Sequence, residues 1–236
     1  MFEFLVTLFD TLLYLPLFNF LVVLYKYIPG SDFGLAVILL TVSIRLVLYS
    51  SSAKSIRNQR ILSEIQPKLQ EIQKTYKDDK EKLVKETMAL YKEAKINPIG
   101  GLAPALVQLP VLIALYRVFW KGFEQVELGR LYGFIPSPGA IDAIFLGLID
   151  LSKPNLIIAV LAGIFQFIQT RLSMETNKKP AKNDFAKVMQ KQMIYFFPVI
   201  TILILMTLPS ALGVYWVTGS IFLIIQQKVV LKKQHG

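Results

Sequence analysis

The stretch Thr41-Val-Ser-Ile-Arg45 (TVSIR) decides how this chain folds, because it places a charge inside an apolar segment. The surrounding residues 33–49 contain no other charged side chain. A guanidinium near the centre of a membrane helix costs roughly 2.5–3.5 kcal/mol on insertion scales, so such an arginine is a functional candidate by default. The other segments predicted to span the membrane contain no Asp or Glu. We therefore expect Arg45 to meet either water or a partner from outside the chain.

Composition indicates several membrane spans rather than one water-soluble core. The 236 residues are 54% hydrophobic and the mean hydropathy is +0.51. The chain has no cysteine, and its one histidine is His235. This excludes thiol catalysis and thiolate metal sites, and it nearly excludes histidine-based catalysis and histidine-rich metal sites. Neither G-x-x-x-x-G-K-[ST] nor G-x-G-x-x-G occurs. We expect no catalytic residue, no metal and no cofactor.

The predicted fold class is an all-α polytopic membrane protein with five transmembrane helices. An apolar segment needs about 20 residues to cross a ~30 Å hydrocarbon core. The five predicted spans are residues 33–52, 98–121, 154–171, 192–208 and 211–231. The segments between and after them are a helical hairpin (53–96), an extracytoplasmic loop (122–153), a cytoplasmic loop (172–191) and a basic tail (232–236).

The charge pattern orients these spans. Residues 53–96 hold eleven Lys or Arg and seven Asp or Glu, and their apolar residues recur at helical spacing. The break YKDDK at 76–80 predicts two antiparallel helices standing in water; a plain solvated loop is the alternative. With residues 171–191 and the three lysines at the C-terminal end, Lys228, Lys232 and Lys233, this segment carries 20 of the 26 basic side chains. The positive-inside rule then places these three segments in the cytoplasm and the N-terminus outside.

Residues 1–28 are apolar with one polar stripe. The stripe repeats at helical spacing and consists of Glu3, Thr7, Asp10, Thr11 and Tyr14. Pro16 is expected to interrupt the helix. We predict an N-terminal amphipathic helix lying in the outer interface, followed by a second short piece ending near Tyr27. The alternative is a first transmembrane span.

Polar side chains in several predicted spans could face one another. Thr41 and Arg45 are four residues apart and share one helix face. The other candidates are Gln108, Gln166, Gln169, Tyr215 and Trp216. A single intramembrane glutamine is often only a helix–helix hydrogen bond, worth about 0.6 kcal/mol. If the faces converge, they form a hydrated concavity with one fixed positive charge.

Four stretches resemble the YidC-type (YidC/Oxa/Alb) membrane protein insertase family in order along the chain. They are GLAVILLTVSIRLVLYS (34–50), QPKLQEIQKTYKDDKEKLVKETMALYKEAKINPIGG (66–101), LAPALVQLPVLIALYRVF (102–119) and FFPVITILILMTLPSALGVYWVTGSIFLIIQQ (196–227). The combination of the arginine with Asn97-Pro98, Gln108-Leu109-Pro110 and Pro209-Ser210 is specific. Each motif alone would be weak.

The resemblance implies insertion of nascent membrane proteins into a bacterial cell membrane without a catalytic step. It also implies a hydrophilic groove that opens to the cytoplasm and to lipid. The implied substrate-binding positions are Arg45, Thr41, Gln108, Gln166, Gln169, Tyr215 and Trp216. The implied partners are client proteins, membrane lipids, the Sec translocon, the ribosome and signal-recognition targeting factors, with no specific nucleic-acid sequence. The alternative function is a small anion transporter or channel, since Arg45 could attract an anion.

Overall fold

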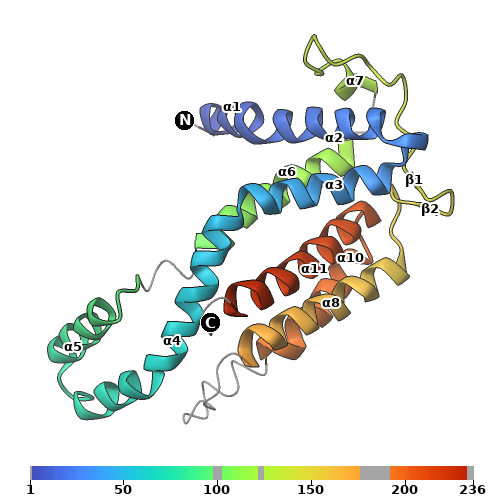
Figure 1. Cartoon of the computed structure of the whole chain (residues 1–236). Helices are drawn as coiled ribbons and strands as arrows, with labels where there is room; N and C mark the ends of the chain where they lie inside the picture. The colour runs from blue at the N-terminus through green and yellow to red at the C-terminus, as the bar shows by residue number, and fades with distance from the viewer. Residues whose placement is uncertain (1, 98–102, 122–124, 176–191, 233–236) are drawn as a thin grey trace.

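The computed structural model describes residues 2–97, 103–121, 125–175 and 192–232, which are mainly helical (Figure 1). The elements in chain order are α1 (Phe2–Phe9), the π-helical turn η1 (Asp10–Tyr14), α2 (Leu15–Tyr27), the 3-10 turn η2 (Pro29–Ser31), α3 (Phe33–Val47), α4 (Tyr49–Thr75), α5 (Lys80–Glu93), α6 (Ala103–Lys121), α7 (Gln125–Leu128), β1 (Ile144–Phe145), β2 (Ile149–Asp150), α8 (Leu156–Glu175), the π-helical turn η4 (Gln192–Phe196), α10 (Phe197–Leu205) and α11 (Ser210–Lys232). Most of the predicted loop 172–191 and of the tail 232–236 lies outside the described residues.

Several of these helices are long and apolar enough to cross a membrane. Within the described ranges they are Glu3–Tyr27, Leu156–Met174 and Ser210–Lys232, with α3 and α4 as a fourth, bent candidate. The all-α membrane fold predicted from the sequence is therefore confirmed. The arrangement of exactly five spans remains a prediction.

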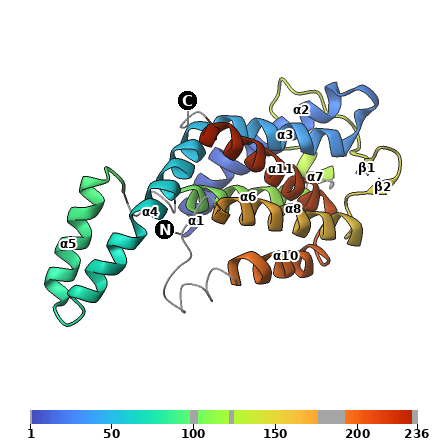
Figure 2. The same cartoon turned by 60° about the horizontal axis from the view of Figure 1, so that its bottom comes forward.

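Helix α11 lies at the centre of the bundle. It packs against α3 on one side and α8 on the other, and α10 covers the far side of α8 (Figure 2). The α8–α10 approach is close at Gly163, where a Cβ atom would overlap the Ile202 side chain. Small residues let membrane helices approach in this way.

The first predicted span, 33–52, is not one straight helix. Helix α3 ends at Val47, and α4 leaves at an angle of 64°. Gln226 of α11 holds the bend, because its Nε2 donates to the Tyr49 carbonyl (2.9 Å) and its Oε1 accepts from the Ser52 hydroxyl (3.0 Å). Beyond the bend, α4 and α5 extend away from the bundle as two arms, at the end where α11 also terminates (Figure 1).

The N-terminal helix does not break at Pro16, so that expectation was wrong. Asp10–Tyr14 forms one π-helical turn, and Pro16 falls in the first turn of α2, where a missing N–H is tolerated. The helix touches the segment between α6 and α8 at several points. Asn19 accepts from the Tyr132 N–H (2.7 Å), the Tyr25 hydroxyl accepts from the Asp142 N–H (3.0 Å), and Lys26 donates to the Pro136 carbonyl (3.3 Å).

A short β-hairpin, β1–β2, lies at the opposite end of the bundle from α4 and α5 (Figure 1). Asp32 links it to α3: one carboxylate oxygen accepts from the Leu35 N–H (2.8 Å) and caps the helix, and the other accepts from the Leu146 N–H (2.6 Å). Next to this link, the Phe145 ring lies where a side chain on Gly34 would be. The hairpin therefore packs tightly onto the first turn of α3.

Candidate functional site

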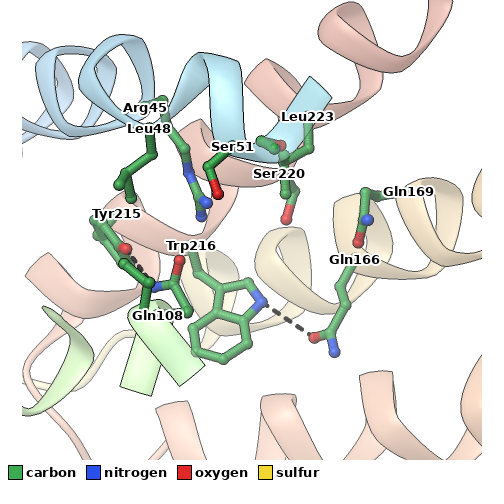
Figure 3. Close-up of a pocket in the computed structure, with 12 residues that line it drawn as sticks. Arg45, Leu48, Ser51, Gln108, Gln166, Gln169, Tyr215, Trp216, Ser220 and Leu223 are labelled. Atoms are coloured by element: carbon green, nitrogen blue, oxygen red, sulfur yellow. Dashed lines mark hydrogen bonds between the residues drawn. The ribbon is translucent and has the colours of Figure 1, made fainter. Parts of the chain in front are cut away.

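A cavity of about 260 Å³ with polar side chains in its wall opens between α3, α4, α6, α8 and α11 (Figure 3). Six of the seven sequence-predicted site residues line it, together with three serines and three apolar residues. The full lining is Arg45, Leu48, Ser51, Ser52, Val107, Gln108, Gln166, Gln169, Tyr215, Trp216, Ser220 and Leu223. Four segments distant in sequence thus contribute polar groups to one concavity.

Arg45 lies in the last turn of α3, and its side chain points into the cavity (Figure 3). Its Nε is buried and has no hydrogen-bond partner among the residues that the structure describes. Among the described residues, no carboxylate lies within salt-bridge distance of its guanidinium. Its Cζ is 6.0 Å from the centre of the Tyr215 ring, a cation–π distance. The charge is thus held by an aromatic face and lacks an anionic partner.

Two hydrogen bonds join the aromatic pair of α11 to the glutamines. Gln108 Nε2 donates to the Tyr215 hydroxyl (2.5 Å), and Trp216 Nε1 donates to Gln166 Oε1 (3.1 Å). Tyr215 is buried, whereas Gln108, Gln166 and Trp216 are half-buried. Both bonds cross from α11 to a facing helix, so the polar groups are paired with one another at the wall of the cavity (Figure 3).

Thr41 is the predicted residue that the structure does not bring to the cavity. It shares a face with Arg45 but lies one turn deeper in the core, where it is fully buried. Its hydroxyl donates to the Val37 carbonyl (2.6 Å), so its own helix satisfies it. Thr41 is thus a core residue in this structure, and its part in substrate binding stays a prediction.

The sequence reasoning missed several cavity residues. Ser51 and Ser52 reach the cavity because α4 bends at Leu48, which the apolar pattern does not reveal. Gly219, which lies against Arg45, and Ser220, which lines the cavity, come about one turn after Tyr215 on α11. Their spacing of four and five residues from Tyr215 is the available signal. No group of three or more metal-ligating side chains gathers in the described part of the chain.

The chain is similar to known proteins over most of its length. The family model described as "60Kd inner membrane protein" matches residues 23–236. A protein of Oceanobacillus iheyensis named "Membrane protein insertase YidC" is 34% identical over 207 residues, which cover 86% of this chain and 76% of that protein.

Two longer relatives carry the same name. The proteins of Francisella philomiragia and Francisella tularensis subsp. novicida are 36% and 37% identical over 202 residues. The match covers 86% of this chain but only 33% of each Francisella protein. With its apolar helices, this likeness makes the chain a multi-pass protein of the bacterial cell membrane. The chain belongs to the YidC family of membrane protein insertases.

Proposed function

We propose that the cavity around Arg45 receives the polar or acidic flank of a nascent membrane protein part-way across the bilayer. An uncompensated charge in hydrocarbon makes such a transfer slow. A hydrated site with a fixed positive charge lowers that barrier for a carboxylate. The family is one of insertases, which displace a segment and make or break no covalent bond, so the chain is not an enzyme.

The observation that carries this proposal is that Arg45 has no anionic partner in the described part of the chain. A buried guanidinium normally pairs with a carboxylate of its own protein. The described residues offer Arg45 an aromatic ring and hydroxyl and amide groups, but no carboxylate within ion-pair distance. An arriving acidic side chain would supply the missing acceptor. The attraction between Arg45 and a client carboxylate is stronger in this partly desolvated cavity than in water.

Release requires that the attraction be modest. The cavity opens to its surroundings, and its amides and aromatic residues already hydrogen-bond to one another. A client flank must give up its hydrogen bonds to water before it can bond to these groups. The net free energy gained is therefore small, about 0.5–1.5 kcal/mol for each hydrogen bond. Partitioning of the client's apolar segment into lipid then completes the transfer.

The packing beyond Arg45 supports an insertase over an anion channel. Toward the β-hairpin end, Leu40 of α3, Leu115 of α6 and Leu212 of α11 are 0–2% exposed. These side chains form an apolar layer one or two turns from the cavity. A channel would need a continuous polar path through this layer. The layer instead favours a groove that ends blind and hands its client sideways to lipid.

The proposed topology has five spans, with the N-terminus outside and the C-terminus inside. Side chains spread from Asp10 to Lys26 contact the segment between α6 and α8, and Asp10 also contacts Arg117 of α6. The 16 steps from Asp10 to Lys26 rise about 24 Å at 1.5 Å per residue. A helix crossing the bilayer would reach an outside loop at one end only, so this spread supports an N-terminal helix lying along the outer surface.

The α4–α5 hairpin is proposed to meet clients before the groove does. It stands at the end of the bundle to which the positive-inside rule assigns the cytoplasm (Figure 1). Its exposed face carries both charge signs and apolar side chains such as Val84 and Met88. Such a surface suits transient contacts with clients, the Sec translocon, the ribosome and targeting factors.

The test is rescue of bacteria depleted of their own insertase by the wild type, Arg45→Ala and Arg45→Lys at matched membrane levels. The readout is insertion of a single-span client with an acidic outer tail, beside the same client with a neutral tail. Alanine should slow the acidic client by roughly tenfold, as even half of a 2.5–3.5 kcal/mol barrier would do. Lysine should support it. Full insertion of both clients by Arg45→Ala would overturn the proposal.

A further inference from the structure

Gly219 lies against the guanidinium of Arg45. A Cβ atom at Gly219 would sit 2.8 Å from Arg45 Nη2, 3.2 Å from Nε and 3.4 Å from Cζ. The distance to Nη2 is shorter than real Cβ contacts, the distance to Nε is tight, and the distance to Cζ is at the limit of ordinary contact. The arginine therefore occupies the volume that a side chain at this position would need.

A glycine inside a helix carries a cost that some other gain must offset. Gly219 is in the interior of α11, where glycine is about 1 kcal/mol less favourable than alanine. Its backbone is ordinary helix and needs no positive φ. Helical conformation thus gives no reason for a glycine here, whereas the contact with Arg45 does.

We propose that Gly219 is a positioning residue for the arginine, and that it sets where the positive charge lies in the cavity. This inference rests on the proposed function, because it concerns the charge that receives the client. Without a side chain at 219, the guanidinium lies against the wall formed by α11, and its Nε is buried there. The open volume of about 260 Å³ then stays free for the client flank.

A methyl group at 219 would move the guanidinium without unfolding the helix. The crowded atoms belong to the far end of a flexible side chain, which can rotate away at little cost. The same substitution raises the helix propensity of α11. The displaced guanidinium must enter the cavity, where it takes up volume and exposes its charge to water. Both effects weaken its attraction for a carboxylate.

The first experiment compares Gly219→Ala with Thr218→Ala in the depletion–rescue assay. Thr218 is the preceding residue on α11 and lines a different, apolar crevice. We expect Gly219→Ala to slow insertion of the acidic-tailed client by about three- to tenfold, a part of the full cost of an unmatched charge. The neutral-tailed client and Thr218→Ala should behave like wild type. Unchanged insertion of the acidic client by Gly219→Ala would overturn the inference.

A double-mutant cycle separates positioning from a merely structural role. Lysine carries a compact ammonium on a flexible stem and lacks the width of the guanidinium. In the Arg45→Lys background, Gly219→Ala should therefore have little further effect. An equal loss in the arginine and lysine backgrounds would mean that the methyl group disturbs α11 itself, which would overturn the inference while leaving the proposed function intact.

A labelling experiment reads the charge position without insertion. The chain has no cysteine, so Ser51→Cys places a single thiol in the cavity wall. The ratio of its reaction rates with anionic and cationic methanethiosulfonates reports the local potential. Arg45→Ala should abolish the preference for the anionic reagent, and Gly219→Ala should change the ratio by about twofold or more. An unchanged ratio in Gly219→Ala would overturn the positioning role. This outcome is distinct from a failure of the proposed function, which the Arg45→Ala variant tests.

Discussion

The side-chain amide of Gln108 donates a hydrogen bond of 2.5 Å to the hydroxyl of Tyr215. This bond connects α6 to α11 across the cavity, and the same tyrosine ring faces the Arg45 guanidinium at 6.0 Å. Tyr215 therefore has two partners: its hydroxyl fixes the position of the glutamine, and its ring contacts the charge. The two functions can be separated by removing the hydroxyl alone.

Tyr215→Phe keeps the ring and should lower insertion of the acidic-tailed client about two- to tenfold, the value of one net hydrogen bond of 0.5–1.5 kcal/mol. Gln108→Leu breaks the same bond and should cost a similar amount. The double variant should lose little more than either single variant, because both remove one interaction. Fully additive losses in the rescue assay would show that the two side chains act independently.

An ion cluster ties the N-terminal helix to α6 and to the segment after it. Asp10 accepts from Arg117 and from Arg130 (3.3 Å), and Glu127 accepts from Arg130 (3.2 Å) and from the Tyr14 hydroxyl (2.7 Å). Only 18% of the Asp10 side chain and 12% of the Glu127 side chain are exposed. The π-helical turn at Asp10–Tyr14 presents the Asp10 carboxylate and the Tyr14 hydroxyl to this cluster.

Asp10→Asn should lower the free energy of unfolding by about 1–3 kcal/mol. Removing one member of a buried pair costs roughly 3–5 kcal/mol, and the partial exposure of the arginines reduces this. The measurement is the unfolding temperature in detergent, monitored by the loss of protease resistance of residues 2–27. Glu3→Gln is the control, because Glu3 is an exposed acid on the same helix. Equal unfolding temperatures for the two variants would contradict the stabilising role of the cluster.

The sequence predicts those features of the fold that depend on periodicity and charge. Apolar runs locate the membrane helices, and the intramembrane arginine locates the cavity, because burying a charge is costly wherever it occurs. The bend after Val47 was missed, since it depends on Gln226, 177 residues from Tyr49. The burial of Thr41 could not be foreseen for a related reason: helical spacing gives a shared face but not the depth of the neighbouring helices.

The polar stripe of residues 1–28 shows a further limit of pattern reading. Asp10 and Tyr14 lie on the predicted polar face, but this face meets Arg117 and Arg130 rather than water alone. An amphipathic pattern gives the polarity of a face and not the identity of its partner. The proposed role of Gly219 could not be predicted for the same reason, because it depends on contact with an arginine from another helix.

The contact between Gly34 and Phe145 gives a third prediction. A methyl group at Gly34 would overlap the Phe145 ring and push it out of its place beside α3. We expect Gly34→Ala to destabilise the fold by about 1–3 kcal/mol, as overpacking usually does. Gly133→Ala is a matched control, because a Cβ atom at Gly133 would have no neighbour within 4 Å and its φ is not positive.

The measurement for this pair is the unfolding temperature together with hydrogen exchange of the β1–β2 amides. Gly34→Ala should lower the former and speed the latter, whereas Gly133→Ala should change neither. In a Phe145→Ala background, Gly34→Ala should have no further effect, since the ring that it displaces is absent. A further loss in that background would mean that the methyl group meets some other part of the hairpin.

Gln226 provides the fourth prediction, because it sets the direction of the α4–α5 hairpin. It is 2% exposed and bonds to both the Tyr49 carbonyl and the Ser52 hydroxyl, immediately after the 64° bend. Gln226→Leu keeps the volume and removes both bonds. Helix α4 has 27 residues, or about 40 Å at 1.5 Å per residue, so a change of only about 10° in the bend would move its far end by roughly 7 Å.

Spin labels on Lys85→Cys of α5 and Leu148→Cys of the β-hairpin turn would measure this movement, because the natural chain has no cysteine to interfere and both positions are exposed. Gln226→Leu should shift or broaden the distance distribution, since the bend loses the two bonds that fix it. Val229→Ala, at an exposed position of the same helix, should leave the distribution unchanged. If Gln226→Leu also leaves it unchanged, then the backbone at Leu48 holds the bend without help from α11.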